Sequence, residues 1–216
     1  MKQKILYLAS KSPRRMKILR VIGKELGIVI RKLNNKSIEG MEEVEKIINS
    51  ETPLEYVTRV AMNKAIFSSQ RLLKISREIN PILCGDTIVC LGNKIFLKPH
   101  STSDVIKMLS ELSNKEHKVI TSIVLALPNF EKNCSFEFHQ INNVTSVLFS
   151  KIPDVWIKNY SKTDEPIDKS GSYAIQGRAS IFIKKISGSY SSVVGLPIHE
   201  THQLLLEKLE NHSPLI

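Results

Sequence analysis

Several features that would assign this chain to a common class are missing from its sequence. Its three cysteines, Cys84, Cys90 and Cys134, form no Cys-x-x-Cys pair, so neither a disulfide framework nor a zinc knuckle is indicated and reduced thiols fit best. No run of five or six like charges suggests a nucleic-acid-binding tail. The first apolar run, residues 5–9, is shorter than the roughly 7–15 residues of a secretory signal, and no stretch approaches a membrane span. We therefore expect a cytoplasmic protein without a membrane or nucleic-acid partner.

The composition that remains is that of an ordinary folded protein. Of the 216 residues, 42% are hydrophobic and 24% are charged, which is enough for one core or for two small lobes that share a cleft. The net charge of +10 would suit an anionic partner. The lysines are scattered along the sequence, however, so we attribute the net charge to general composition and not to a binding partner. We expect a single domain spanning residues 1–216, with lobe boundaries that the sequence does not assign.

Apolar periodicity and turn residues predict a chain in which strands and helices are mixed. Helices are expected after Ser12-Pro13 and Thr52-Pro53, where a capping hydroxyl precedes proline. Further helices are expected at residues 103–112, at 154–160 and from 197 onward. Strands are expected at residues 5–9, 27–33, 82–91, 94–97, 118–127, 136–149, 180–186 and 192–194. This pattern predicts an α/β or α+β fold, with a mixed twisted sheet and flanking helices.

A basic segment follows the first predicted strand. Residues 10–15 read Ser-Lys-Ser-Pro-Arg-Arg and lie at a strand-to-helix junction, a common ligand position in open sheets. Arg14 and Arg15 fall in the first turn of the helix, where the macrodipole disfavours cations unless an anion neutralises them. A phosphate is the natural anion. The alternative is two solvated surface arginines, and the segment alone does not choose between them.

A carboxylate interrupts an otherwise apolar strand at residues 82–91. Burying Asp86 is costly unless it is paired, bound to metal or open to a cleft. Strict alternation would place Asp86 and Thr87 on opposite faces, unless Gly85 introduces a bulge. The alternative is that the strand ends at Gly85, but apolar residues continue beyond it. Lys98 could reach back to Asp86 or bind phosphate, or it could simply be exposed.

A glycine-hinged loop at residues 168–177 precedes the predicted strand at 180–186. Its glutamine, Gln176, can both donate and accept hydrogen bonds, so it could read the edge of a base. The alternative is a solvated loop side chain.

Five segments together resemble the successive signatures of the Maf (septum-formation-protein-like) nucleotide pyrophosphatases. They are residues 8–15, 85–89, 98–99, 168–177 and 188–197. The resemblance runs from about residue 5 to about residue 206. It implies a Maf/Ham1-like fold, shared with inosine-triphosphate pyrophosphatases, in which two lobes flank a cleft. It also implies hydrolysis of a nucleoside triphosphate between its α and β phosphates with a divalent metal, Mg²⁺ or Mn²⁺, and a homodimer.

The resemblance also assigns reaction roles. Asp86 matches the catalytic aspartate of the family and would activate water, and Glu45 matches an acidic active-site residue. Both would hold the metal. Lys64 and Lys98 match basic positions near the phosphates, where together with Arg15 they would neutralise charge on the leaving pyrophosphate.

The choice of nucleotide follows from other positions. Arg14, Thr87 and Gln176 agree with the branch of the family that cleaves dTTP and UTP, and they would hold the pyrimidine. Ser10 is expected to bind substrate beside them.

Some residues depart from the family pattern. Ser170, Ser172 and Ala174 replace smaller residues in the late loop, and residues 178–180 replace a glycine-richer segment. The added side chains could restrict the loop and alter rate or base preference. Two other functions stay open: a house-cleaning pyrophosphatase for modified nucleotides, and a non-catalytic regulator of cell division.

Overall fold

A single mixed sheet organises the chain in a computed structural model, which describes residues 4–33, 44–48, 50–75, 78–131 and 135–210. Its strands run in the order β2-β1-β3-β5-β6-β7, and the short β4 pairs with β3. The strands are β1 (Ile5–Leu8), β2 (Val29–Lys32), β3 (Ile82–Leu91), β4 (Lys94–Phe96), β5 (Glu116–Asn129), β6 (Ser135–Phe149) and β7 (Ile183–Ser187). β1 is parallel to both of its neighbours, whereas β3 through β7 pair in antiparallel fashion. The predicted mixed sheet is confirmed.

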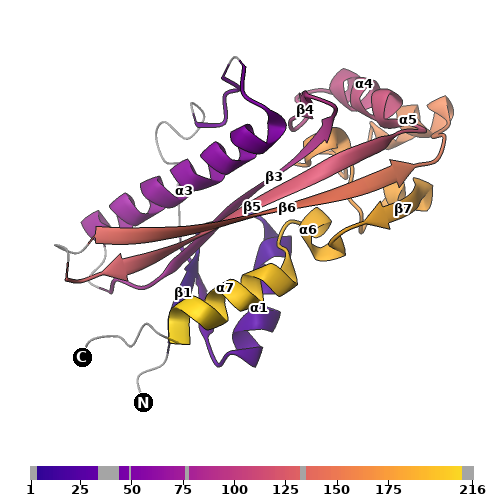
Figure 1. Cartoon of the computed structure of the whole chain (residues 1–216). Helices are drawn as coiled ribbons and strands as arrows, with labels where there is room; N and C mark the ends of the chain where they lie inside the picture. The colour runs from indigo at the N-terminus through magenta and orange to yellow at the C-terminus, as the bar shows by residue number, and fades with distance from the viewer. Residues whose placement is uncertain (1–3, 34–43, 49, 76–77, 132–134, 211–216) are drawn as a thin grey trace.

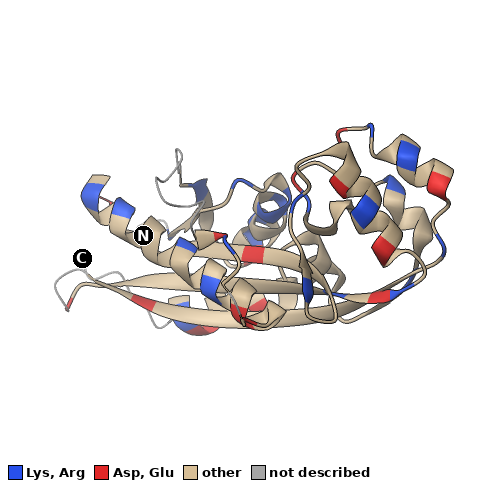
Figure 2. Cartoon of the chain, turned by 90° about the horizontal axis from the view of Figure 1, so that it is seen from above, with Lys and Arg blue, Asp and Glu red and all other residues tan. Residues whose placement is uncertain are grey.

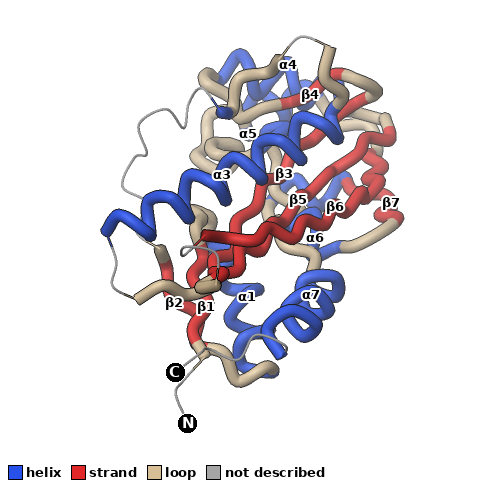
Figure 3. The backbone as a smooth tube through the Cα atoms, turned by 60° about the vertical axis from the view of Figure 1, so that its left-hand side comes forward, coloured by secondary structure: helices blue, strands red, loops and turns tan. Residues whose placement is uncertain are grey.

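Helices cover both faces of this sheet. They are α1 (Pro13–Glu25), α3 (Pro53–Ile75), α4 (Thr102–Leu112), α5 (Asp154–Tyr160), α6 (Tyr190–Val194) and α7 (Ile198–Glu210), with the 3-10 turns η1 (Ser170–Ser172) and η2 (Arg178–Phe182). The long helix α3 runs along one face, while α1 and α7 lie side by side on the other (Figures 1 and 3). We call these the α3 face and the α1 face.

Side chains of β3 alternate strictly between the two faces. Ile88 and Cys90 pack with the start of α3, whereas Leu83 packs with α1 and α7. Val89, also on the α1 face, packs with α4 and α5 farther along the strand. This alternation sends the neighbouring residues Asp86 and Thr87 to opposite faces.

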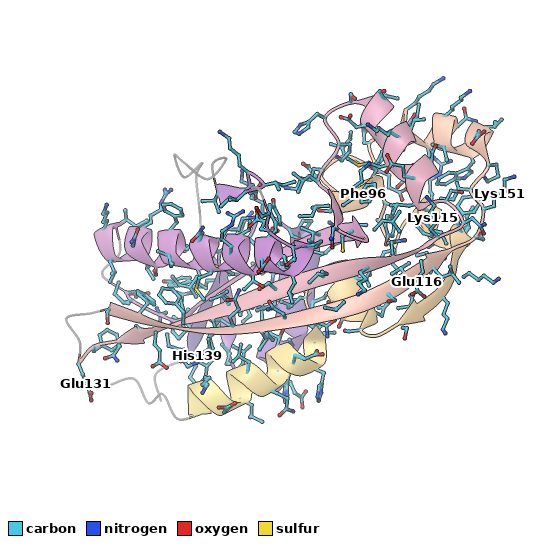
Figure 4. The ribbon with its side chains drawn as sticks, turned by 45° about the horizontal axis from the view of Figure 1, so that its top comes forward. Phe96, Lys115, Glu116, Glu131, His139 and Lys151 are labelled. Carbon is cyan, nitrogen blue, oxygen red and sulfur yellow. The ribbon has the colours of Figure 1, made fainter. Side chains whose placement is uncertain are left out.

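The hairpin of β5 and β6 spans the molecule from end to end. In Figure 4, Glu131 lies near its turn, whereas Lys115 and Lys151 lie at the far end. One end carries the core formed with α1 and α7, and the other carries a separate core built around α4 and α5. The hairpin thus joins two separate cores.

Local capping explains where two helices begin. The Ser12 hydroxyl accepts a hydrogen bond from the Arg15 amide at 3.3 Å, and Pro13 opens α1. At α3 the Thr52 hydroxyl accepts from the Glu55 amide at 3.3 Å, while the Glu55 carboxylate accepts from the Thr52 amide at 2.7 Å. This capping box satisfies amide groups that the helix itself leaves unpaired. Both predicted starts are confirmed.

One predicted strand is wrong, and another begins later than predicted. Residues 192–194 belong to helix α6, because the Ser189 hydroxyl accepts from the Ser192 amide at 3.2 Å and caps a helical turn that Gly195 ends. Residues 180–182 form the end of the 3-10 turn η2, so the predicted strand begins only at Ile183. The polar, acidic segment at residues 34–50 has no clear apolar period and is expected to be a loop, but most of it lies outside the described residues.

Charge is spread over many elements. Figure 2 shows lysine, arginine and acidic residues interspersed over the helices and the strands, in agreement with the scattered lysines of the sequence. Among the residues that the structure describes, every helix is either too short or too polar to cross a lipid bilayer.

Candidate active site

One pocket of about 1210 Å³ collects all of the site residues proposed from the sequence. Those that line it are Ser10, Arg14, Arg15, Glu45, Lys64, Asp86, Thr87, Lys98 and Gln176. They come from segments scattered along most of the chain, so the fold brings together what the sequence separates. The pocket also takes residues from different parts of the core: Leu33 belongs to the cluster that packs against α3, and Tyr173 belongs to the cluster around α4 and α5.

The pocket lies where one edge of β3 is left open. β1 pairs with β3 only as far as Leu83, and β4 begins to pair only at Val89. Between these points β5 is the only strand paired with β3 among the described residues. Because no strand covers this edge, side chains from both faces of β3 reach the same pocket.

On the α3 face, one ammonium group bridges two carboxylates. The Nζ atom of Lys64 lies 2.8 Å from Oδ1 of Asp86 and 2.5 Å from Oε1 of Glu45. The side chains of Lys64 and Asp86 are 15% and 18% exposed, while that of Glu45 is 42% exposed. All three groups therefore meet at the pocket wall, with the carboxylates aimed at one point.

The ion pairs shift two pKa values in opposite directions. Burial alone would raise the pKa of Glu45, but the Lys64 ammonium outweighs burial and lowers it. Burial alone would lower the pKa of Lys64, but the Asp86 and Glu45 carboxylates outweigh burial and raise it. The arrangement therefore keeps Glu45 ionised and Lys64 protonated at neutral pH.

Helix α3 places Glu45 by holding its backbone. The Tyr56 hydroxyl donates to the Glu45 carbonyl at 2.8 Å, and Arg59 donates to the carbonyls of Val44 and Lys46, each at 2.9 Å. These bonds join the short segment that carries Glu45 to Tyr56 and Arg59, which lie more than one turn before Lys64 on α3.

Lys98 takes no part in this bridge. Its side chain is exposed at the pocket rim, and the ammonium that bonds to Asp86 belongs to Lys64. Lys98 therefore does not reach back to Asp86 and is an exposed cation that faces the pocket. Its charge still contributes to lowering the pKa of Glu45.

On the α1 face, the guanidinium of Arg15 is fixed at three points. It donates to the Gly195 carbonyl at 2.7 Å, to the Thr87 hydroxyl at 2.8 Å and to the Ser10 hydroxyl at 3.3 Å. No carboxylate lies within ion-pair distance of Arg15 among the described residues. Burial lowers its pKa, and Arg14 lowers it further, while Asp86 opposes both effects. Because arginine stays protonated in proteins, this is a desolvated cation without a bound counter-charge.

Gly85 is needed for close packing, and the bulge suggested for it is absent. β3 and β5 pair without a register shift from Ile82 to Cys90. A Cβ atom at Gly85 would lie 2.5 Å from the side chain of Ile123 and 3.0 Å from the Ser122 carbonyl oxygen. The glycine therefore lets β5 and Arg15 approach the strand, which stays regular.

The late loop is held in place at both ends. The Glu165 carboxylate accepts from the Arg178 amide at 2.8 Å and from the Tyr160 hydroxyl at 3.1 Å. Gly177 has no side chain to collide with Glu165, since a Cβ there would lie 1.9 Å from its oxygen. Lys169 donates to the Glu165 carbonyl. Gln176, between these anchors, is exposed and faces the pocket.

The serines that depart from the family pattern make specific bonds. The Ser170 hydroxyl donates to the Thr87 carbonyl at 3.0 Å and ties the loop to the open edge of β3. The fully buried Ser172 adopts a positive φ of 62° and bonds to the sulfur of Met108 at 3.0 Å. Both side chains add contacts to the loop, as expected of residues that restrict it.

The lining of the pocket is strongly cationic. Seven lysine or arginine side chains face four carboxylates. Burial lowers the pKa of Lys169, and the nearby Arg14 lowers it further. A bound anion would stabilise cations held this close together, so the lining favours a multiply charged anionic ligand.

Comparison with known proteins agrees with this geometry. A family model described as Maf-like protein matches residues 5–208. The chain belongs to the Maf-like protein family. Proteins named dTTP/UTP pyrophosphatase from Albidiferax ferrireducens and Ralstonia nicotianae are each 39% identical to it. The first alignment covers 93% of this chain and 94% of the relative, and the second covers 94% and 93%.

The fold is shared more widely than the Maf-like family. The structure of a HAM1 protein from Coxiella burnetii superposes with a TM-score of 0.50 at 12% identity, covering 94% of this chain and 99% of that one. The Ham1 protein of Staphylococcus aureus gives the same score and identity, covering 95% and 100%. The Ham1-like architecture expected from the sequence is confirmed.

Sequence reasoning missed three residues that shape this Maf-like site. Lys169 was visible as a basic residue inside a recognised segment. Glu165 lies just before that segment and accepts a hydrogen bond from the backbone amide of Arg178. Such a bond to the backbone leaves no pattern in the sequence. Thr121 is fully buried in β5 and its hydroxyl lies 2.9 Å from that of Thr87, but threonine is a common strand residue and gives no sequence signal.

Proposed function

We propose that the chain hydrolyses nucleoside triphosphates to the monophosphate and pyrophosphate, with dTTP and UTP as substrates. The observation that carries this proposal is the placement of a partly exposed carboxylate, Asp86, beside a concentration of cations in one pocket. The names of the relatives supply the substrate class. A volume of about 1210 Å³ accommodates a whole nucleotide, since pockets for smaller ligands occupy roughly 300–1,000 Å³.

A divalent metal fits the residues that are present. Among the described residues no group of three or more potential ligands gathers in one place, yet Glu45 and Asp86 converge on the same ammonium. Two protein carboxylates completed by substrate phosphates and waters are a usual environment for Mg²⁺. We propose that Glu45 and Asp86 hold a Mg²⁺ or Mn²⁺ ion that arrives with the nucleotide. When bound, the ion would neutralise phosphate charge and polarise the phosphorus–oxygen bonds.

Asp86 serves in this proposal as the base for the attacking water. Only its Oδ1 atom is bonded to Lys64, so Oδ2 can accept a proton at the pocket wall. The water attacks the α-phosphorus, the bond to the bridging oxygen breaks, and pyrophosphate leaves with the electron pair. Lys64 holds the carboxylate in one orientation throughout.

Cations around the pocket act on the leaving group. We propose that Arg15, Lys64 and Lys98 neutralise the charge that develops on pyrophosphate, with Lys169 added from the structure. Arg14 and Gln176 select the pyrimidine, Thr87 acts through its bond to Arg15, and Ser10 supports the phosphate end through its own bond to Arg15.

A metal-dependent assay of pyrophosphate release tests the proposal directly. Purified protein is incubated with dTTP, UTP, CTP, GTP and methylated nucleotides, each with Mg²⁺, Mn²⁺ or excess chelator. The proposal expects pyrophosphate from dTTP and UTP only when metal is present. A preference for methylated nucleotides would instead indicate a house-cleaning enzyme. Failure to release pyrophosphate from any nucleotide would leave the non-catalytic regulator as the better account.

A further inference from the structure

We propose that Thr121 is a positioning residue for phosphate binding, acting through Thr87 to fix the guanidinium of Arg15. Thr121 is fully buried in β5 and does not line the pocket, so it cannot touch a ligand itself. The inference rests on the proposed function for its biological meaning, because it concerns how the same pocket holds a pyrophosphate group.

The direction of each hydrogen bond can be worked out from the number of protons available. The Thr121 hydroxyl donates its single proton to the Ser192 carbonyl at 2.8 Å, and a carbonyl can only accept. In the 2.9 Å contact between the two hydroxyls, Thr87 must therefore be the donor and Thr121 the acceptor. The Thr87 proton is then used, so Thr87 can only accept from Arg15 at 2.8 Å.

These bonds close into a ring through helix α6. Arg15 donates from its Nε atom to the Gly195 carbonyl, and the Gly195 amide donates to the Ser192 carbonyl at 2.9 Å. Ser192 is in turn the acceptor for Thr121. The guanidinium is therefore held on two sides by a ring whose hydrogen bonds all have one permitted direction, which removes its freedom to rotate.

The ring leaves a defined part of the guanidinium for a ligand. Arginine has five N–H donors, and three of them are used by Gly195, Thr87 and Ser10. The remaining two have no protein acceptor in the part of the chain that the structure describes. They belong to a desolvated cation at the pocket wall, which suits them to phosphate oxygens.

The same proton count changes the role of Thr87. Its hydroxyl has no proton to offer a base or a sugar, so it cannot select a nucleotide as a donor. Thr87 instead acts on the substrate through Arg15, and Thr121 determines that it does so. A threonine at position 87 thereby links the open edge of β3 to phosphate binding.

The test compares T121V with the matched variant T121S, which keeps the hydroxyl. The dissociation constant of pyrophosphate is measured by calorimetry, and KM and kcat are measured with dTTP. Loss of one net hydrogen bond in the ring should weaken pyrophosphate binding about three- to tenfold and raise KM similarly while kcat changes less. T121S should bind like the wild type. If T121V melts at a lower temperature but binds pyrophosphate normally, Thr121 is only structural and the proposal is overturned.

A second variant, T87V, separates action through Thr87 from any other route. It breaks the ring at a half-buried position. Pyrophosphate affinity should fall to a similar extent as in T121V. T87V therefore suffices for the test if T121V does not fold. In the T87V background, T121V should add little further loss. Equal and additive losses would overturn the proposed route.

Weakened pyrophosphate binding in a protein that hydrolyses no nucleotide would retain this inference and reject the proposed function. Absence of pyrophosphate binding by the wild type would reject both.

Discussion

The two faces of β3 deal with charge in opposite ways at the pocket. On the α3 face, Lys64 bonds to both Asp86 and Glu45, so each of these three charges has a partner at 2.8 Å or less. On the α1 face, Arg15 has no carboxylate partner among the described residues and is held by neutral acceptors. Two consecutive residues, Asp86 and Thr87, belong to these different systems because a strand alternates its side chains. One open strand edge thus presents a carboxylate and a fixed cation to the same pocket.

Replacing the carboxylate on the α3 face should have the largest effect. Asp86→Asn keeps the shape of the side chain and an acceptor for Lys64, but it removes the base. We expect turnover of dTTP to fall by about 10²–10⁴, measured as pyrophosphate release at saturating substrate. The melting temperature should change little, which circular dichroism would check. Near-normal turnover by this variant would remove Asp86 from the role of base.

The α1 face contains a second titratable group that should make stability depend on pH. His117, on β5, is 2% exposed, and burial lowers its pKa to about 4 from 6.5. Its Nε2 atom bonds to the Tyr173 hydroxyl at 2.7 Å. As pH falls from 6.5 toward 4, the unfolded chain binds a proton that the folded chain does not, so the free energy of unfolding decreases by up to about 3 kcal/mol.

Urea denaturation at several pH values measures this effect. In His117→Gln, which keeps a donor and an acceptor but does not titrate, the decrease between pH 6.5 and 4 should be smaller than in the wild type. Glu45 provides an internal contrast, since its lowered pKa predicts a loss only below pH 4.5. An equally steep decrease in both proteins would mean that His117 is not the group responsible.

Enlarging Gly85, which lies on the α1 face of β3 beside Arg15, should disturb both packing and substrate binding. Gly85→Ala places a Cβ atom 2.5 Å from the side chain of Ile123 and 3.0 Å from a backbone oxygen, and overpacking of this kind costs about 1–3 kcal/mol. We expect chemical denaturation to show that loss and KM for dTTP to rise, because Arg15 lies beside Gly85. Gly92→Ala serves as a control, since its Cβ meets no atom within 4 Å although its φ is positive. It should leave KM unchanged.

The smallest expected effect concerns metal affinity without nucleotide. Lys64 occupies the point on which Glu45 and Asp86 converge, so it competes with a divalent cation there. Lys64→Met should bind Mn²⁺ about tenfold more tightly than the wild type, a difference of about 1.4 kcal/mol. Electron paramagnetic resonance of free Mn²⁺ measures this without any activity. Lys64→Arg, which keeps the charge, should resemble the wild type, and equal affinities in all three proteins would argue against competition.

Much of the fold was predictable because its signals are local. The capping residues Ser12 and Thr52 predict where their helices begin. The ten apolar-rich residues of β3 were predicted with their observed limits. The failures also have local causes. Val193 and Val194 favour a strand by propensity, yet the Ser189 cap and the left-handed Gly195 enclose a helical turn between them.

The site was predictable where a residue conflicts with its surroundings. Asp86 stands out in an apolar strand, and two arginines stand out at a helix start. Thr121 conflicts with nothing, because threonine suits a strand, and its function depends on a carbonyl 71 residues away in the sequence. Such long-range bonds carry no sequence pattern, so they emerge only from the folded chain.

The length of β1 has a consequence for how this pocket could change. β1 stops at Leu8, and β4 begins pairing at Val89, so a short stretch of β3 has a bare edge. Two further residues in strand conformation after Leu8 would pair with Cys84 and Gly85, and would therefore cover the first part of that stretch and narrow the pocket. The size of the opening therefore depends on where the neighbouring strands stop as well as on the side chains that line it.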